Sequence, residues 1–244
     1  MNKAYELIKH QGNQNLFVFG DHASRHIPTV YNTLGLSGGD LTRHIAWDIG
    51  TEVIVRRLCE HFQCGGQLAS VSRLVIDMNR DPEAAGLIPE MSDGTIIVGN
   101  ENLTPLEKQA RVDDYYGPYH AKLGESLDAL SSPFVLSIHS FTPHPHTGDA
   151  RKTDIGLLIK HDEESAEQFR QSMEANHPEY KVGMNLPYSA YDLNYTVDAH
   201  VAIRRLRHLA IEIRQDHIST NKDASLMADR LATCLKPVLQ HAVT

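Results

Sequence analysis

Leu16-Phe17-Val18-Phe19-Gly20-Asp21-His22 is the clearest structural signal in this chain. An unbroken apolar run that ends at a glycine predicts a short strand buried on both faces. Asp21 and His22 follow at once. Polar residues just beyond the end of a buried strand are where α/β proteins place ligand chemistry. We therefore expect a functional site at the end of this strand.

Two later apolar runs also deliver polar residues. The strand predicted over Pro133–His139 ends in a histidine, and the strand predicted over Leu209–Ile213 carries Glu212 between two isoleucines. A carboxylate on a core strand costs free energy unless it is paired or ligated. Glu212 is therefore expected either to pair with an arginine or to serve as a general base or metal ligand.

Helices and strands alternate along the rest of the chain. The patterns predict helices over Asp40–Phe62 (capped by Asp40), Pro105–Leu130 (broken at Gly117-Pro118), Glu163–Ala175 and Asn221–His241, and strands over Gln67–Ala69, Arg73–Met78, Thr95–Val98 and Asp154–Ile159. The segments 81–100 and 188–196 are expected to be irregular. This alternation predicts one α/β domain over residues 1–244, a three-layer sandwich whose mixed, largely parallel central sheet is flanked by helices.

Composition and charge limit the classes of partner and the cellular compartment that we expect for this protein. The net charge of −8 over 244 residues argues against nucleic acid or an anionic membrane as a partner, but leaves a small anionic substrate open. Three cysteines do not make a disulfide framework. Without an apolar leader or a long apolar run, a cytoplasmic protein is expected, and homo-oligomerisation is left open.

His22 and His139 are natural zinc ligands at the ends of two predicted core strands. A catalytic zinc ion needs a third protein ligand. The residues alone leave several candidates for it: Asp48, His26, Asp21 (which could instead orient an imidazole), and the less anchored His144 and His146.

Arg73 and the pair Asn79-Arg80 frame the predicted Arg73–Met78 strand. An arginine binds a carboxylate through two N–H groups, and an asparagine amide adds a donor. The alternative is that each arginine forms an ordinary surface salt bridge. A Gly-rich phosphate loop does not occur. The motifs GxSxG and HExxH are also absent, which disfavours serine hydrolases and thermolysin-type enzymes.

Five strings in order resemble the N-formylglutamate amidohydrolase family, over about residues 16 to 218. They are Asp21-His22-Ala23-Ser24-Arg25-His26-Ile27-Pro28, His44-Ile45-Ala46-Trp47-Asp48-Ile49-Gly50, Ser72-Arg73-Leu74-Val75-Ile76-Asp77-Met78-Asn79-Arg80, Ile138-His139-Ser140-Phe141 and Ile211-Glu212-Ile213-Arg214-Gln215-Asp216.

The resemblance implies a fold similar to that of zinc carboxypeptidases. In those enzymes a histidine comes early, an Asn-Arg pair holds the substrate carboxylate, a second histidine follows in Ser-x-His-Ser, and a late glutamate is the base. The present chain matches that order with His22, Asn79-Arg80, Ser137-Ile138-His139-Ser140 and Glu212. It departs at Arg25, where carboxypeptidases have a glutamate ligand. The family keeps an acid at Asp48, so the resemblance favours Asp48 as the third ligand.

The resemblance also implies a mechanism. Zinc or another divalent metal, held by His22, Asp48 and His139, lowers the pKa of a bound water. Glu212 takes the proton from that water and passes it to the leaving amine. Arg73 assists the metal in stabilising the oxyanion.

On the substrate side, the resemblance implies that Asn79 and Arg80 anchor a carboxylate and that Tyr191 or Tyr195 closes over the site. With N-formylglutamate the products are formate and glutamate. Two alternatives remain. One is carboxypeptidase-like or amidase activity on another N-acyl amino acid or a peptide, and the other is a non-catalytic protein that binds a small carboxylate.

Overall fold

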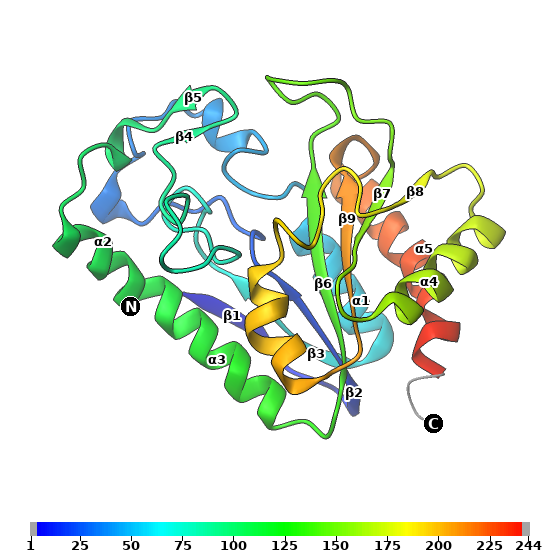
Figure 1. Ribbon diagram of the computed structural model, residues 1–244. Coiled ribbons are helices and arrows are strands. Elements are labelled where there is room, and N and C mark those ends of the chain that lie inside the picture. Colours follow the sequence, from blue (N-terminus) through cyan, green and yellow to red (C-terminus); the bar gives the residue numbers. More distant parts are fainter. Residues whose placement is uncertain (1–3, 241–244) are drawn as a thin grey trace.

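The computed structural model describes residues 4–240, and within them a seven-stranded mixed sheet forms the centre of the molecule (Figure 1). In spatial order its strands are β1 (Tyr5–Ile8), β3 (Cys64–Ala69), β2 (Asn13–Gly20), β6 (Phe134–Phe141), β9 (His208–Arg214), β7 (Ile155–Leu158) and β8 (Val182–Met184). Strands β3, β2, β6 and β9 run parallel, whereas β1 and β7 run antiparallel to their neighbours β3 and β9. The expected mixed, largely parallel sheet is confirmed.

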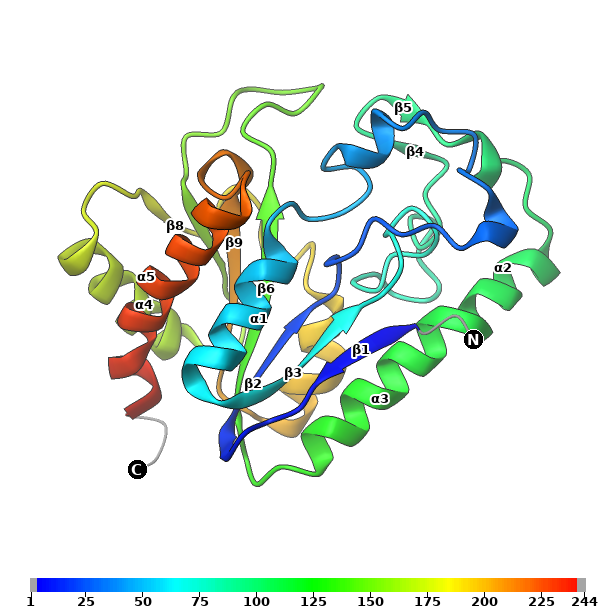
Figure 2. The ribbon, with the colours of Figure 1, turned by 180° about the vertical axis from the view of Figure 1, so that it is seen from behind.

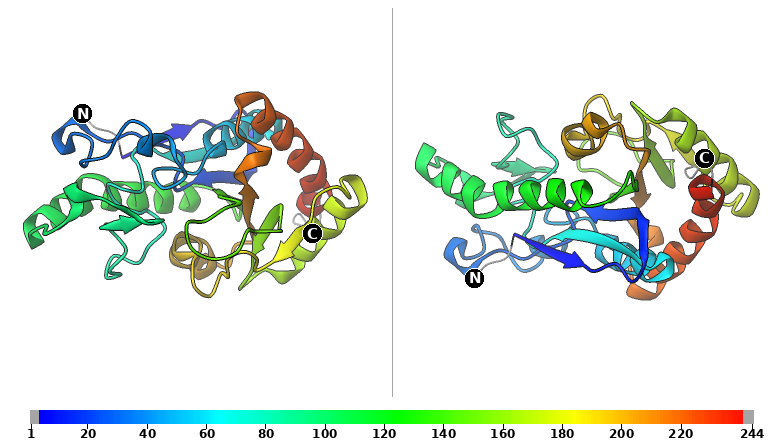
Figure 3. Two further views of the ribbon diagram at one scale, coloured as in Figure 1. Left: turned by 90° about the horizontal axis from the view of Figure 1, so that it is seen from above. Right: turned by 90° about the horizontal axis from the view of Figure 1, so that it is seen from below.

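Helices cover both faces of this sheet. One face carries α1 (Thr51–Phe62), α4 (Glu163–Asn176) and α5 (Asn221–Gln240), and the other carries α3 (Gly117–Asp128) and the π-helical turn η5 (Val197–Val201). Figures 2 and 3 show α1 and η5 on opposite sides of the strands.

The alternation of side chains along β2 explains the three layers. Leu16 and Val18 belong to the core beneath α1, α4 and α5, whereas Phe17 and Phe19 belong to the core beneath α3. Successive side chains of a strand point to opposite faces, so an unbroken apolar run suits a strand that is covered on both sides.

Short elements complete the chain. A small hairpin joins β4 (Met91–Ser92) and β5 (Thr95–Ile96), α2 (Pro105–Arg111) leads into the π-helical turn η4 (Val112–Tyr116), and single 3-10 turns occur at η1 (Thr29–Tyr31), η2 (Asp40–Thr42), η3 (Val98–Asn100), η6 (Ala202–Arg204) and η7 (Gln215–His217). None of the helices within residues 4–240 is both long and apolar enough to cross a membrane.

The helix predicted over Asp40–Phe62 is wrong in its first half. Asp40 opens only the 3-10 turn η2, and α1 begins at Thr51. Gly50, just before α1, has φ of +83°, and a Cβ there would lie 2.7 Å from the carbonyl oxygen of Ile218. The left-handed backbone at Gly50 interrupts any helix that would run from Asp40 into α1. Asp48 therefore lies in the turn before α1 and not in a helix.

The strand predicted over Arg73–Met78 is also wrong. Its residues are mostly buried, but they form turns with no place in the sheet. Side chains from distant segments bond the carbonyl oxygens instead: Asn100 Nδ2 donates to Leu74 O at 2.8 Å, and Arg111 donates to Val75 O at 2.9 Å. The apolar run was correctly predicted to be buried, but side-chain donors replace a neighbouring strand.

The other differences are local. The break predicted at Gly117-Pro118 is instead the π-helical turn η4, which ends where Gly117 N donates to Val112 O five residues back. Helix α3 then begins at Gly117, and Pro118, which has no N–H, lies in its first turn. The pattern missed the short edge strands β1 and β8, and β5 ends at Ile96 rather than Val98. The predicted end of the last helix, His241, lies outside the described residues.

Candidate metal centre

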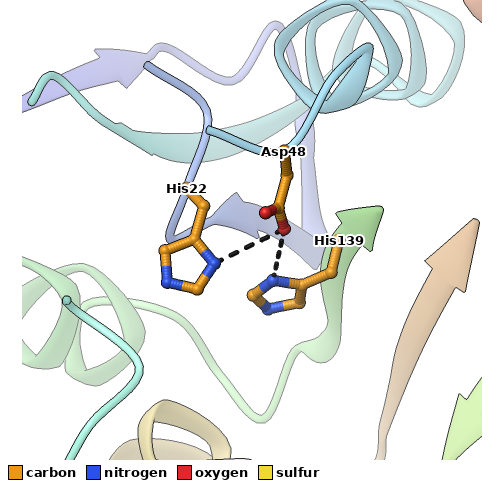
Figure 4. Close-up of side chains that lie close together, drawn as sticks. All are labelled: His22, Asp48 and His139. Atoms are coloured by element: carbon orange, nitrogen blue, oxygen red, sulfur yellow. Dashed lines mark hydrogen bonds and ion pairs between the residues drawn. The ribbon is translucent and has the colours of Figure 1, made fainter. Parts of the chain in front are cut away.

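Three side chains converge above the carboxyl ends of the parallel strands. His22 follows the end of β2, His139 lies on β6, and Asp48 reaches them from the turn before α1 (Figure 4). Asp48 Oδ2 lies 3.4 Å from His22 Nδ1 and 3.0 Å from His139 Nδ1. All three residues are buried, and one ligand atom of each lies within 4.8 Å of the others.

The second nitrogen of each imidazole is also engaged. His22 Nε2 lies 2.6 Å from Asp77 Oδ1, and His139 Nε2 lies 3.1 Å from Ser137 Oγ and 3.5 Å from Asp21 Oδ2. Metal-binding histidines almost always donate their other N–H to such an oxygen, which turns the free nitrogen toward the metal. Here that arrangement turns both Nδ1 atoms toward Asp48, the side on which a metal would bind.

These residues fit a divalent metal ion. His22 Nδ1 is buried but has no hydrogen-bond partner among the described residues. Two nitrogens and a carboxylate oxygen form a common zinc donor set, and tetrahedral ligands at 2.0–2.1 Å from zinc lie about 3.3 Å apart. The distances from Asp48 to the two imidazoles are close to that separation. The group of His22, Asp48 and His139 could therefore hold a metal.

The charges around the group favour an added cation. Asp21, Asp48 and Asp77 are all buried here, and Arg73 is the guanidinium that contacts two of them, at 3.3 Å from Asp48 Oδ1 and 2.7 Å from Asp77 Oδ2. Burial acts to raise the pKa of the Asp48 carboxyl, but the nearby His22, His139 and Arg73 outweigh it and hold that pKa well below its usual range.

The imidazoles respond in the opposite direction. Burial acts to lower the pKa of His139, but hydrogen bonds to Asp21 and Asp48 raise it well above the usual value. Burial and Arg73 act to lower the pKa of His22, but Asp77 and Asp48 outweigh them and raise it. Both imidazoles therefore tend to hold protons when no metal is bound. A metal ion would supply the same positive charge in their place.

Glu212 lies beside this group without a partner. On the sheet it is directly opposite His139, and its Oε2 is buried with no hydrogen-bond partner within residues 4–240. No arginine among these residues forms an ion pair with it, so the ion-pair alternative finds no support. Burial raises the pKa of the Glu212 carboxyl, and the nearby His139 only partly offsets that effect.

A cavity of about 160 Å³ opens over these residues. The side chains predicted to act together line it: His22, Asp48, His139, Glu212, Arg73, Asn79 and Arg80. Arg80 is about one-third exposed, and its nearest acidic contact within the described chain is Asp77 at 3.9 Å. Its guanidinium is thus free to meet an anionic ligand.

The tyrosines predicted to close over the site lie elsewhere. Tyr191 and Tyr195 line a neighbouring depression on the other side of Asn79 and Arg80, and Tyr191 is 71% exposed. Tyr188 lines the cavity itself, with the Arg151 guanidinium stacked 4.6 Å from its ring centre.

The remaining histidine candidates do not join the group. His26 is exposed and lines a separate groove. The backbone N–H of His146 donates to Asp93 Oδ1 at 2.7 Å at the rim, where Asp93 also contacts His44. His144 lies in the same loop.

Asp48 is therefore the acid that meets the two imidazoles, and Asp21 takes the orienting place beside His139.

Asp77 is the member of this site that the sequence reasoning missed. It follows three buried apolar residues, so the cost of burying an unpaired carboxylate, which drew attention to Glu212, applied to it equally. The signal is present in the sequence, but the apolar pattern of the segment favours an ordinary strand.

Comparisons with known proteins agree with the sequence resemblance. The profile of the N-formylglutamate amidohydrolase family matches residues 15–219. Gene product Atu2144 of Agrobacterium tumefaciens has a similar crystal structure, with a TM-score of 0.92 and 32% sequence identity over 99% of this chain and 97% of that one. A search of curated sequences found no match.

The N-formylglutamate amidohydrolase of Ralstonia eutropha JMP134 is a more distant structural relative. The TM-score is 0.72 at 20% identity, and 98% of each chain is covered. At this identity the likeness bears on the fold alone, and it supports the α/β architecture described above.

Proposed function

The chain belongs to the N-formylglutamate amidohydrolase family, and from this premise we propose that it is a metal-dependent amidohydrolase that releases formate from N-formylglutamate. Members of this family are hydrolases of carbon–nitrogen bonds other than ordinary peptide bonds. The metal, the general base and the substrate are the parts that the proposal adds.

The main support for this proposal is the arrangement of four side chains. Two imidazoles and one carboxylate each place a ligand atom within 4.8 Å of the others, while an unpartnered buried glutamate lies on the adjacent strand. A purely structural cluster would satisfy its polar groups internally. Unsatisfied donors and acceptors at a cavity wall are instead typical of a site that waits for a ligand.

We assign the chemistry as follows. When bound to His22, Asp48 and His139, a divalent metal such as zinc supplies a Lewis acid that activates water and polarises the amide carbonyl. Glu212 takes the proton from the attacking water and delivers it to the leaving nitrogen. Arg73 holds Asp48 and Asp77 in place and offers its cavity-facing charge to the developing oxyanion.

Asn79 and Arg80 bind the substrate carboxylate in this proposal. Both line the cavity, and the Arg80 guanidinium is about one-third exposed, with Asp77 at 3.9 Å as its acidic contact. The cavity volume of about 160 Å³ is below the range usual for drug-sized ligands, which favours a small amide over a long peptide.

The test combines metal content with product release. Purified protein should hold about one zinc-like ion per chain, and it should release formate from N-formylglutamate faster than it cleaves N-acetylglutamate or short peptides. The metal-free protein should be inactive and should recover on adding zinc. Full activity without metal would exclude the mechanism, and preferred cleavage of peptides would exclude the substrate.

A further inference from the structure

The segment that carries Asn79 and Arg80 is held in place by side chains from two distant π-helical turns and their neighbours. Met78 O lies 3.0 Å from His120 Nε2 and accepts from Thr196 Oγ1 at 3.2 Å, while Arg80 O accepts from Tyr116 Oη at 2.7 Å. Tyr116 ends η4, His120 follows in α3, and Thr196 directly precedes η5. The backbone on both sides of Asn79 is thus fixed from outside the sheet.

The same contacts set the direction of the Asn79 amide. The backbone N–H of Thr196 lies 2.9 Å from Asn79 Oδ1. A backbone N–H can only donate, so the amide atom facing it must be the oxygen. The NH₂ group is therefore the part of Asn79 that remains for a ligand, and it is a donor suited to a carboxylate.

A second histidine, His200, helps to determine which ring nitrogen of His120 carries the proton. His120 Nε2 faces a carbonyl oxygen, so it must carry the proton, and in a neutral imidazole Nδ1 is then an acceptor. His120 Nδ1 lies 2.8 Å from His200 Nε2, and the two ring planes are nearly parallel, 13° apart, with centres separated by 5.0 Å. His200 must accordingly donate through Nε2. Burial lowers the pKa of His120 to about 4 and also lowers that of His200, so both are neutral near pH 7.

His200 is itself anchored to α3. Arg204 donates to His200 O at 2.9 Å and forms two hydrogen bonds with Asp128, at 2.7 and 2.9 Å. His200 is only half-buried, and it does not line the cavity. Its side chain reaches the ligand cavity through His120, which in turn contacts the Met78–Arg80 backbone.

We propose that His200 is a positioning residue for carboxylate binding: by donating to His120 it fixes the imidazole tautomer that holds Met78 O, and with it the Asn79–Arg80 pair. The inference rests on the proposed function, in which this pair binds the substrate carboxylate. It adds a residue remote from the metal whose effect falls on substrate binding and not on the chemical step.

The test compares His200→Phe, which keeps a flat ring but loses the donor, with His200→Gln, which keeps a donor. Both are assayed as zinc-loaded protein, with formate release for KM and kcat, calorimetric binding of glutamate, and metal analysis. His200→Phe should raise KM and weaken glutamate binding roughly fivefold, the value of about one neutral hydrogen bond. Its kcat and metal content should match the wild type, and His200→Gln should restore binding.

Separate outcomes distinguish this inference from the proposed function. If the wild type binds glutamate but releases no formate, the proposed function fails, and the binding arm still decides the role of His200. If the wild type neither binds glutamate nor releases formate, both are overturned; formate release without glutamate binding overturns the inference alone. Unchanged binding in His200→Phe, or a loss that His200→Gln fails to restore, overturns the inference alone.

A measurement on the wild type does not depend on how the variants fold. In ¹⁵N-labelled protein near pH 7, the ring nitrogen shifts of His120 and His200 should identify the Nε2–H tautomer in both. A proton on His120 Nδ1 would contradict the proposed direction of donation.

Discussion

The two halves of the candidate site are built in different ways. His22, His139 and Glu212 lie on or directly after strands of the parallel sheet, where ladder hydrogen bonds fix the backbone and place Glu212 opposite His139. Asp48 and the 73–80 segment belong to turns outside the sheet. We call these the strand half and the turn half of the site.

The turn half depends on partners far away in sequence. Ser72 Oγ donates to Ala46 O at 2.6 Å, which ties the two turns together, and buried Arg111 donates to both Val75 O and Asn100 Oδ1. A strand keeps its backbone bonded whatever its side chains are, whereas these turns lose buried hydrogen bonds when a remote side chain changes. Remote substitutions should therefore disturb the turn half selectively.

The largest expected effect lies in the strand half. Glu212→Gln removes the proposed base but none of the three candidate ligands, so kcat should fall by about 10³-fold while metal content stays unchanged. Formate release and metal analysis measure both quantities, and the exposed Glu101→Gln is the matched control. An active Glu212→Gln variant would show that the strand half does not supply the base.

Acid should weaken the contacts that hold the turn half. The pKa of His120 is lowered by burial to about 4, below the usual 6.5, so the unfolded chain takes up this proton first as the pH falls. Neutral His120 therefore contributes up to about 3 kcal/mol to the free energy of unfolding. This contribution is fully present above about pH 6.5 and is lost as the pH falls toward 4. Chemical denaturation of wild type and His120→Gln between pH 7 and 4 measures it; equal pH dependence in both would contradict this prediction.

Asp77 belongs to the turn half and contacts the strand half directly, because its Oδ1 lies 2.6 Å from His22 Nε2. Asp77→Asn keeps the size but weakens the orienting acceptor, so metal affinity should fall roughly 10- to 100-fold. Competition with a chelator measures that affinity. The exposed Asp114→Asn should bind metal as the wild type does, and equal affinities in the two variants would remove Asp77 from the site.

The smallest expected effect concerns Arg80 of the turn half. Arg80→Ala should raise KM for N-formylglutamate about tenfold and change kcat little, because a charge-assisted contact to the substrate is lost. Arg25→Ala is an informative control, since Arg25 is exposed and lines a different groove. A fall in kcat with unchanged KM would assign Arg80 to the chemistry instead of to substrate binding.

The strand half of the site could be predicted from the sequence, whereas most of the turn half could not. The buried strands that carry His139 and Glu212, and the one that His22 follows, were predicted within a few residues, because an apolar run that ends in polar residues is a local pattern. Asp48 was the favoured third ligand by resemblance, although the helix assigned to it was wrong. The apolar residues of the 73–78 segment favour a strand because they are indeed buried, and burial alone does not distinguish a sheet from turns held by side chains.

The layered α/β fold, the family and the chemical identity of the residues at the strand ends therefore follow from the amino-acid order. The folded chain is needed to show that Asp48 and not His26 meets the two imidazoles, and that Asp77 orients His22. It is also needed to show that Asn79 and Arg80 are held by His120, Thr196 and Tyr116. The two groups of features differ in the sequence separation of the contacts that fix them. Strand formation follows from neighbouring residues along the chain, whereas each turn of the site is fixed by hydrogen bonds to side chains that become neighbours only after folding.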